Sequence, residues 1–192
     1  MPTPPNAPVP PIRVAVLVGC AAEGRPGSAA RWIAGLAAER DDLDVDVLDL
    51  AEARLPDYPA EGPPGPGPLP RAVLDLAPWL AAADAFVVVN DAEDADVSGD
   101  TGGDTGGDKP PAVLGNALDW YADEWRAKPV AFVGPPESAG LRAAFTGLHA
   151  MTLRESVAFP GAEHSDALPM LDRLAWWGRA LRDARAADPY PG

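Results

Sequence analysis

Short apolar runs along the chain alternate with segments in which apolar residues recur every three or four positions. Residues 12–19 read IRVAVLVG, a nearly continuous apolar run that ends in glycine. Such a run is typical of a parallel strand covered on both faces. Residues 28–40 follow, with apolar side chains at helical spacing: Trp32, Ile33, Leu36 and Ala37. The pattern predicts a strand, a glycine-rich turn and a helix.

The same alternation continues to the end of the chain. It predicts further strands at residues 45–50, 85–90, 129–134 and 155–160, and further helices at residues 71–82, 112–125, 140–149 and 168–185. The strand at 45–50 reads VDVLDL, and its alternation of apolar and acidic residues indicates a half-exposed strand near a sheet edge. Strands and helices that alternate in this way predict an α/β protein with a parallel sheet and right-handed crossovers.

Three segments stand outside this pattern. Residues 55–70 are dense in proline and glycine, which cannot sustain a helix and remove backbone donors that a sheet needs, so we expect a surface loop. Residues 91–109 are acidic and contain a tandem Thr-Gly-Gly-Asp repeat, which predicts a mobile, solvated loop. Residues 1–11 form a Pro-rich tail. We therefore expect one domain over residues 12–187.

Composition and charge exclude several classes of function. The net charge of −14 makes nucleic acid an unfavourable partner, because the average surface repels phosphate backbones. No apolar stretch approaches the roughly 20 residues that cross a bilayer, so no membrane association is expected. The N-terminus does not resemble a secretory signal, which indicates a cytoplasmic protein. Cys20 is the single cysteine, so an intrachain disulfide is excluded.

Three stretches of the sequence resemble one family. Residues 111–134 read PAVLGNALDWYADEWRAKPVAFVG and match that family's helix and following strand almost residue by residue, except for Gly115 where lysine is usual. Residues 171–185 carry the paired Trp176 and Trp177 that are common there, and residues 17–27, LVGCAAEGRPG, occupy the place of a phosphate loop. The chain thus resembles the NAD(P)H-dependent FMN reductases.

This resemblance implies a fold, a cofactor and an assembly. The fold is a flavodoxin-like three-layer sandwich with a five-stranded parallel sheet in the order 2-1-3-4-5. The implied cofactor is FMN, with NAD(P)H as the candidate reductant. The helix at residues 112–125 helps to form oligomers in the family, and its several aromatic residues exceed what one face against a sheet requires. We therefore expect a homodimer or a tetramer.

The resemblance also implies where the cofactor residues lie. In an open α/β sheet, ligands bind beyond the carboxyl ends of the strands, so the loops after the first, third and fourth strands are expected to hold FMN. The aligned positions in these loops are Cys20, Ala22, Gly24, Arg25, Gly27, Asp91, Ala92, Glu93, Asp94, Gly134 and Pro135.

The first of these loops has lost most of what would bind a phosphate. The family places a serine and an arginine where this chain has Cys20 and Ala22. Glu23 adds a negative charge beside the expected dianion, and Pro26 lacks an N–H that a helix N-terminus would offer. Charge-assisted hydrogen bonds contribute about 1.5–3 kcal/mol each, so their loss predicts a drop in affinity of several orders of magnitude.

The other two loops depart from the family as well. Residues 90–94 read NDAED where the family has Thr-Pro-Glu-Tyr-Asn against the flavin ring, and none of the five matches. The family's glycine pair after the fourth strand is here Gly134 followed by Pro135, and proline has no N–H to donate. Three altered loops together predict that FMN binding is weak or lost.

Several alternatives remain open at this stage. Three functions are compatible with the sequence. The chain is either a divergent flavin reductase, or an enzyme with flavin-free chemistry that takes another small molecule in the pocket where the family binds flavin, or a non-catalytic binding or scaffold protein. Cys20 is either a nucleophile of lowered pKa or a small buried residue. The acidic run at 91–108 either binds Ca²⁺ or Mg²⁺ or is simply solvated. His149 and His164 form no metal or triad pattern. Asp119 and Glu124 face either a pocket or a neighbouring subunit.

Overall fold

The strands and helices expected from the hydrophobic pattern alternate along the chain in the computed structural model. Their order is β1 (Ile12–Val18), α1 (Pro26–Ala38), β2 (Leu43–Asp49), α2 (Arg71–Ala82), β3 (Ala85–Val89), α3 (Ala112–Trp120), β4 (Pro129–Val133), α4 (Ala139–Gly147), β5 (Met151–Val157) and α5 (His164–Ala187). The structure describes residues 9–19, 26–62, 64–65, 67–89, 110–134, 139–159 and 161–191. The whole acidic segment at 91–109 and the start of the Pro-rich tail, residues 1–8, therefore lie outside the described residues.

The five strands form one parallel sheet in the order β2-β1-β3-β4-β5. This order confirms the flavodoxin-like prediction. It also confirms that β2, with its alternating acidic residues, lies at an edge of the sheet. The inner strands β3 and β4 are buried at every position, as a strand covered on both faces must be.

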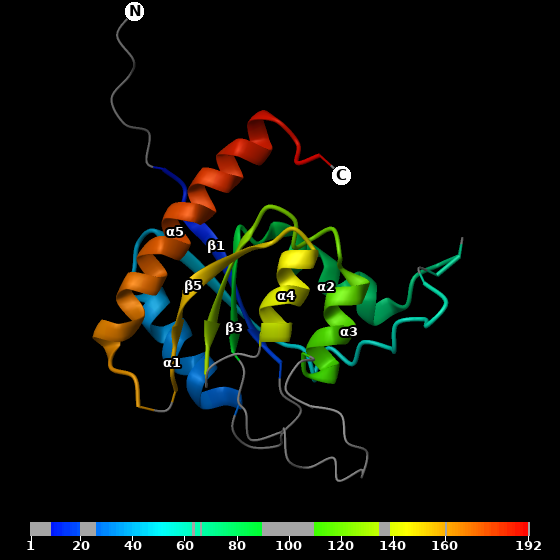
Figure 1. Ribbon diagram of the computed structural model, residues 1–192, viewed down its shortest axis with the longest axis horizontal. Coiled ribbons are helices and arrows are strands. Elements are labelled where there is room, and N and C mark those ends of the chain that lie inside the picture. The colour runs from blue at the N-terminus through cyan, green and yellow to red at the C-terminus, as the bar shows by residue number, and fades with distance from the viewer. Residues whose placement is uncertain are drawn as a thin grey trace, which may run out of the picture.

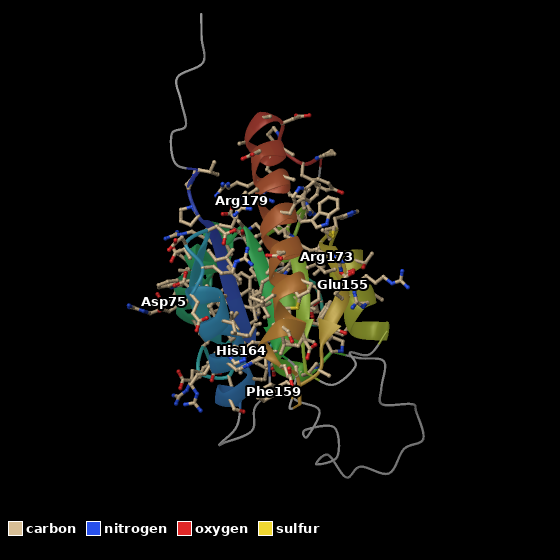
Figure 2. All side chains as sticks on the ribbon, turned by 90° about the vertical axis from the view of Figure 1, so that its left-hand side faces the viewer. Asp75, Glu155, Phe159, His164, Arg173 and Arg179 are labelled. Atoms are coloured by element: carbon tan, nitrogen blue, oxygen red, sulfur yellow. The ribbon has the colours of Figure 1, made fainter. Side chains whose placement is uncertain are left out.

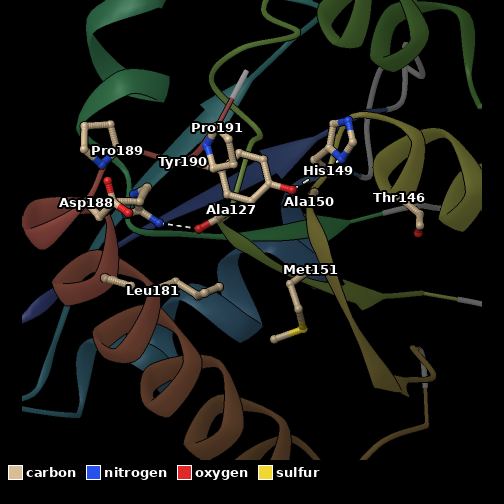
Figure 3. A pocket seen from close by; sticks show the side chains of 12 residues that line it. Ala127, Thr146, His149, Ala150, Met151, Leu181, Asp188, Pro189, Tyr190 and Pro191 are labelled. Carbon is tan, nitrogen blue, oxygen red and sulfur yellow. Dashed lines mark hydrogen bonds between the residues drawn. The ribbon is translucent and has the colours of Figure 1, made fainter.

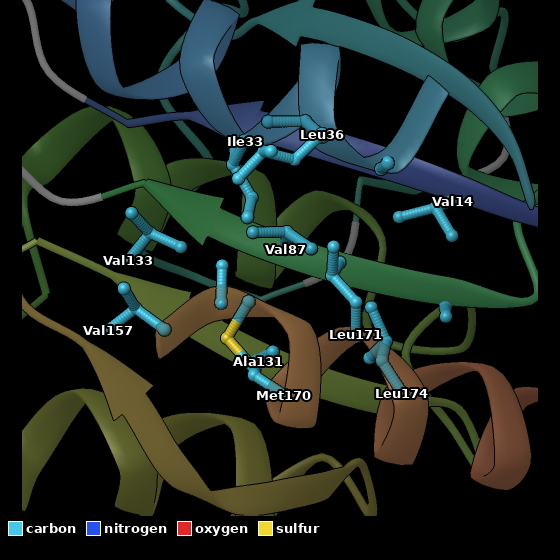
Figure 4. Packing of buried hydrophobic residues seen from close by; sticks show 14 of the residues in the cluster. Val14, Ile33, Leu36, Val87, Ala131, Val133, Val157, Met170, Leu171 and Leu174 are labelled. Atoms are coloured by element: carbon cyan, nitrogen blue, oxygen red, sulfur yellow. The ribbon is translucent and has the colours of Figure 1, made fainter. Parts of the chain in front are cut away.

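Helices cover both faces of the sheet and make it the middle of three layers (Figure 1). Helices α1 and α5 lie on one face, and α2, α3 and α4 lie on the other (Figure 1). Because successive side chains of a strand point to opposite faces, Val14 and Val16 of β1 join the core beneath α1 and α5, whereas Ala15 and Leu17 join the core beneath the other three helices. Figure 4 shows the first of these cores, in which Ile33 of α1 and Leu171 of α5 meet Val87 of β3.

Three boundaries differ from the predicted ones by four residues or more. Helix α3 ends at Trp120 rather than at 125, because Tyr121 leaves the helical conformation with φ −121° and ψ 37°. The turns that follow carry Trp125 into the core, where its ring lies 4.7 Å from that of Phe86. Strand β5 begins at Met151 rather than at 155, since polar residues on an edge strand weaken the apolar signal. Helix α5 begins at His164, four residues earlier than expected, where Glu163 and the helix's third residue form a capping box.

Helix α5 approaches β1 closely at Gly178. A Cβ atom added there would lie 2.9 Å from Cγ2 of Ile12 on β1, which is closer than real Cβ contacts come. Glycine at this position therefore sets the distance between the helix and the sheet.

Within the part of the chain that the structure describes, no helix has both the length and the apolar character needed to span a bilayer.

Candidate functional site

The carboxyl ends of four neighbouring strands form one level edge. Val18 of β1 pairs with Val89 of β3, Val89 with Val133 of β4, and Val133 with Val157 of β5. The three loops that the sequence singled out leave from the first three of these strands, next to one another. The fold therefore brings their starting points together at the edge where parallel α/β sheets bind ligands.

Two of the predicted cofactor residues fall within the described backbone: Gly27 lies in the first turn of α1, and Gly134 directly follows β4. The others lie outside the described residues, and their arrangement around a ligand stays a prediction. These are Cys20, Ala22, Gly24, Arg25, Asp91, Ala92, Glu93, Asp94 and Pro135. The acidic run and Cys20 lie outside them as well, so neither the metal-binding nor the nucleophile hypothesis is tested.

Helix α1 starts at Pro26, at the carboxyl end of β1. Proline suits the first helical position, because the N–H of that residue has no partner inside the helix. The same unpaired N–H groups are what a helix N-terminus offers to a phosphate. With proline there, this end of α1 has one backbone donor fewer to offer a ligand.

Gly134 has a structural reason to be glycine. Its φ of 138° lies where residues with a side chain are strained, and its N–H donates to the carbonyl of Val157 over 2.9 Å. This contact ties the end of β4 to the end of β5. The presence of Gly134 is therefore explained by the backbone alone and is no evidence that a flavin ring is bound beside it.

The segment that most resembles the family holds a loop in place. Asn116 of α3 accepts a hydrogen bond from the N–H of Tyr58 (2.7 Å) and donates to the carbonyl of Pro56 (2.9 Å). Trp120 donates to the same carbonyl over 2.7 Å, and its ring meets that of Tyr58 edge to face. Asn116 and Trp120 thus clamp the loop that follows β2. The motif reports the fold rather than the cofactor.

The aromatic residues near the end of α3 are used within the chain. The Tyr121 hydroxyl is buried and donates to the carbonyl of Val73, and this burial raises its pKa to about 12. Trp125 is fully buried against Phe86 and Phe145. The argument that these aromatics are surplus, from which an oligomer through this helix was expected, is therefore wrong. The oligomer itself stays a prediction.

The two acidic candidates near α3 occupy different surroundings. Asp119 is exposed and lines an open hollow of about 380 Å³ on the outer side of α3, together with Asp57 and Gly115. Glu124 faces the buried Lys128, with its Oε2 4.0 Å from Nζ. The structure does not bring the two carboxylates together in one pocket.

Sequence reasoning missed an aromatic group beside the carboxyl edge. The ring of Trp32 on α1 lies 5.4 Å from that of Phe159, which follows β5, and 6.4 Å from that of His164 at the start of α5. Figure 2 shows Phe159 and His164 near the same end of the molecule. The three residues are far apart in the sequence, and no local pattern joins them. They brace the second turn of α1 against the start of α5.

A larger hollow of about 540 Å³ lies at the opposite, amino-terminal edge of the sheet. Figure 3 shows its wall, in which the Tyr190 hydroxyl lies 3.4 Å from Nδ1 of His149 and Arg185 donates to the carbonyl of Ala127. His149 has a positive φ of 60°. Among the described residues, no group of three potential metal ligands comes together, at this edge or elsewhere.

Lys128 is a buried cation at the same amino-terminal edge. Its Nζ donates to the carbonyl of Leu80 (2.9 Å) and that of Ala81 (3.2 Å), at the end of α2. Burial lowers its pKa from 10.5 to about 8, opposed mainly by the nearby Glu124. Between these two values the unfolded chain holds a proton that the folded chain has lost, so the contribution of Lys128 to stability rises with pH in this window.

We expect Lys128→Met to remove this pH dependence. The free energy of unfolding of the wild type minus that of the variant should rise by on the order of 2 kcal/mol between about pH 8 and pH 10.5, since one pH unit corresponds to about 1.4 kcal/mol. Urea unfolding of both proteins at several pH values measures this difference. Tyr121 and the other titratable groups are present in both proteins, so their contributions to the pH dependence cancel in the difference. A difference that stays constant across the window contradicts the assignment.

The fold defines the class of the protein: it is a flavodoxin-like α/β protein. The model of the NADPH-dependent FMN reductase family matches residues 12–100, and this part of the chain is similar to that family. The match spans β1 to β3, and it confirms the resemblance inferred from the sequence.

Several solved structures share the fold at low sequence identity. FerB, a flavoenzyme NAD(P)H:(acceptor) oxidoreductase from Paracoccus denitrificans, is 18% identical, with 90% of this chain and 96% of that chain covered and a TM-score of 0.58. A mutant flavodoxin from Pseudomonas aeruginosa is 20% identical, with 88% and 99% covered and a TM-score of 0.51. An NAD(P)H:quinone oxidoreductase from Methanothermobacter marburgensis is 14% identical, with 90% and 98% covered and a TM-score of 0.51. The search of curated proteins finds no match.

Proposed function

We propose that this chain is a divergent member of the NAD(P)H-dependent FMN reductase family in which FMN binding is weak or lost. The observation that carries the proposal is that the three altered loops start from adjacent strands. Val18, Val89 and Val133 are paired neighbours, and each precedes a loop that departs from the family's pattern. Changes in three loops around one ligand act on the same binding free energy.

The phosphate end of the site carries the largest expected loss. Cys20 and Ala22 supply neither the hydroxyl nor the guanidinium of the family, and Pro26 supplies no N–H at the start of α1. Glu23 and the net charge of −14 oppose a dianion in addition. Each missing charge-assisted hydrogen bond removes about 1.5–3 kcal/mol, and every 1.4 kcal/mol is a factor of ten in affinity.

The ring end of the site adds to this loss. The family's Thr-Pro-Glu-Tyr-Asn is replaced by Asn90 and the acidic residues after it, and Pro135 cannot donate a backbone hydrogen bond. If reductase activity is retained, we expect NAD(P)H as the electron donor and free FMN as a weakly bound substrate rather than a resident cofactor. We place the protein in the cytoplasm, as a homo-oligomer.

The test is the visible absorption of the purified protein, followed by titration with FMN. We expect a colourless protein and a dissociation constant no tighter than about micromolar, read from the quenching of flavin fluorescence. Denaturing the protein and assaying the supernatant for released flavin controls for a bound flavin of altered spectrum. A yellow protein with one FMN per chain would overturn the proposal, and the chain would then be an ordinary flavin reductase.

A further inference from the structure

The hollow at the amino-terminal edge of the sheet has the character of a small-molecule site. Its volume of about 540 Å³ lies within the roughly 300–1,000 Å³ that such sites occupy. Figure 3 shows Tyr190 and the prolines beside it on one side of the hollow, with Leu181 and Met151 on the other. Most of the lining is apolar, as ligand pockets usually are. The apolar residues come from the start of β5, the end of α5 and the segment after it: Ala150, Met151, Leu181, Ala184, Pro189 and Pro191.

Two residues of this lining have a backbone conformation that residues with a side chain seldom adopt. The φ of Ala127 is 50° and that of His149 is 60°. The N–H of Ala127 donates to the carbonyl of His149 over 2.9 Å, and Arg185 donates to the carbonyl of Ala127. A strained backbone persists only where the surrounding contacts fix it, and it is common at ligand sites. The rim of the hollow is therefore fixed in shape.

Asp188 places an unpaired carboxylate at this rim. It directly follows α5, it is the one acidic residue among the described residues that line the hollow, and it takes part in no ion pair with another described residue. Arg185 lines the hollow as well, but it donates to the carbonyl of Ala127, and its Nη2 lies 3.6 Å from Oδ1 of Asp84. The positive charge of Arg185 is thus used within the chain, whereas the negative charge of Asp188 is available to a ligand.

The ends of two helices add negative potential at the same place. Helix α4 ends at Gly147 and α5 ends at Ala187, and a residue near the end of each, Thr146 and Ala184, lines the hollow. The C-terminal end of a helix attracts cations, because its last carbonyls have no partner inside the helix. Tyr190 is 43% exposed, and the free part of its ring offers an aromatic surface that also attracts a cation. The charges at the hollow therefore favour a positively charged organic molecule over an anionic one.

We propose that this hollow binds a small organic amine. The apolar or aromatic body of the amine lies against Met151 and Leu181, and its protonated amino group lies near Asp188. A carboxylate ligand would face Asp188 and the negative ends of the two helices, and a neutral ligand would gain the apolar contacts alone. The hollow is at the edge of the sheet opposite to the loops after β1, β3 and β4, so the inference does not depend on whether FMN is bound.

Three probes with the same phenyl ring and different charges test the proposal: phenethylamine, phenethyl alcohol and phenylpropionate. In NMR titrations of the purified protein we expect a dissociation constant on the order of 1 mM for the amine, the range open to so small a molecule. The alcohol should bind about threefold to fivefold more weakly, the usual effect of an exposed ion pair, and the carboxylate more weakly still. The N–H signals of Ala150 and Met151 should shift, and that of Gly134 at the carboxyl edge should not. A carboxylate that binds as tightly as the amine, or shifts at Gly134 instead, would overturn the proposal.

Matched variants separate the hollow from the general attraction between an amine and a protein of net charge −14. Asp188→Asn should bring the amine to the affinity of the alcohol, whereas Asp183→Asn, the same change on α5 outside the hollow, should leave it unaltered. Ala184→Trp should abolish the binding of both probes by filling the hollow, and Ala186→Trp should not. All the substituted residues are exposed, and circular dichroism checks that each variant folds. Equal losses in the two asparagine variants, or binding retained by Ala184→Trp, would contradict the assignment of the site.

Discussion

The triple variant Cys20→Ser/Ala22→Arg/Pro26→Val is expected to bind FMN at least about tenfold more tightly than the wild type. In the proposed site the serine hydroxyl and the arginine guanidinium would be available to the phosphate, and valine would return an N–H to the first turn of α1. Two charge-assisted contacts at about 1.5–3 kcal/mol each would permit a larger gain, but the altered ring loops limit it. Titration of flavin fluorescence measures both affinities.

Riboflavin supplies the matched control for this variant. It carries the same isoalloxazine ring as FMN but no phosphate, so its affinity should be unchanged by the three substitutions. An equal gain for both ligands would show that the effect does not act through the phosphate. No gain for FMN would mean that the loop after β1 is not a phosphate loop in this chain, and the assignment of the site would fall with it.

Gly178→Ala is expected to destabilise the fold by about 1–3 kcal/mol, the range typical of overpacked cores. The added methyl group would lie 2.9 Å from Cγ2 of Ile12, so either α5 or β1 has to move. Thermal and urea unfolding monitored by circular dichroism measure the change. Because Gly178 is on the buried side of α5, the substitution leaves the outward side of the helix unchanged and acts on folding.

Gly35→Ala provides the opposite result from the same chemical change. Gly35 lies within α1, and a Cβ atom there would meet no heavy atom within 4 Å. Alanine is favoured over glycine inside a helix, so this variant should be more stable by about 0.5–1 kcal/mol. If both variants shifted stability in the same direction, the close approach of α5 to β1 would not be the cause.

The order of strands and helices could be predicted because the signals that define it are local. The continuous apolar residues of β1 and the alternating apolar and acidic residues of β2 each indicate how the strand is buried. The family resemblance then implies the order of the strands in the sheet. The end of α3 could not be predicted in this way. Residues 121–125 look helical, but burying Trp125 against Phe145 requires the chain to turn, and that preference exists only once α4 is in place.

The sequence predicts which loops form the candidate site, because each of them directly follows a predicted strand. It does not predict the contacts made within the site. The row formed by Val18, Val89 and Val133 is a property of a parallel sheet, so the adjacency of the three loops followed from the fold. The contacts of Asn116 with the loop after β2 could not be foreseen, since the two segments are about sixty residues apart. The motif around Asn116 indicated the family for a reason of packing, which the sequence alone does not reveal.

The level edge of the sheet has a consequence for how such a protein diverges. The strands end on valines whose side chains lie in the core beneath α1 and α5, so the register of the sheet is set before the chain enters the loops. Substitutions beyond Val18, Val89 or Val133 can therefore change what is bound with little effect on folding. The sheet acts as a platform on which each loop is exchangeable by itself, and this makes the edge a suitable place to graft a different ligand site by design.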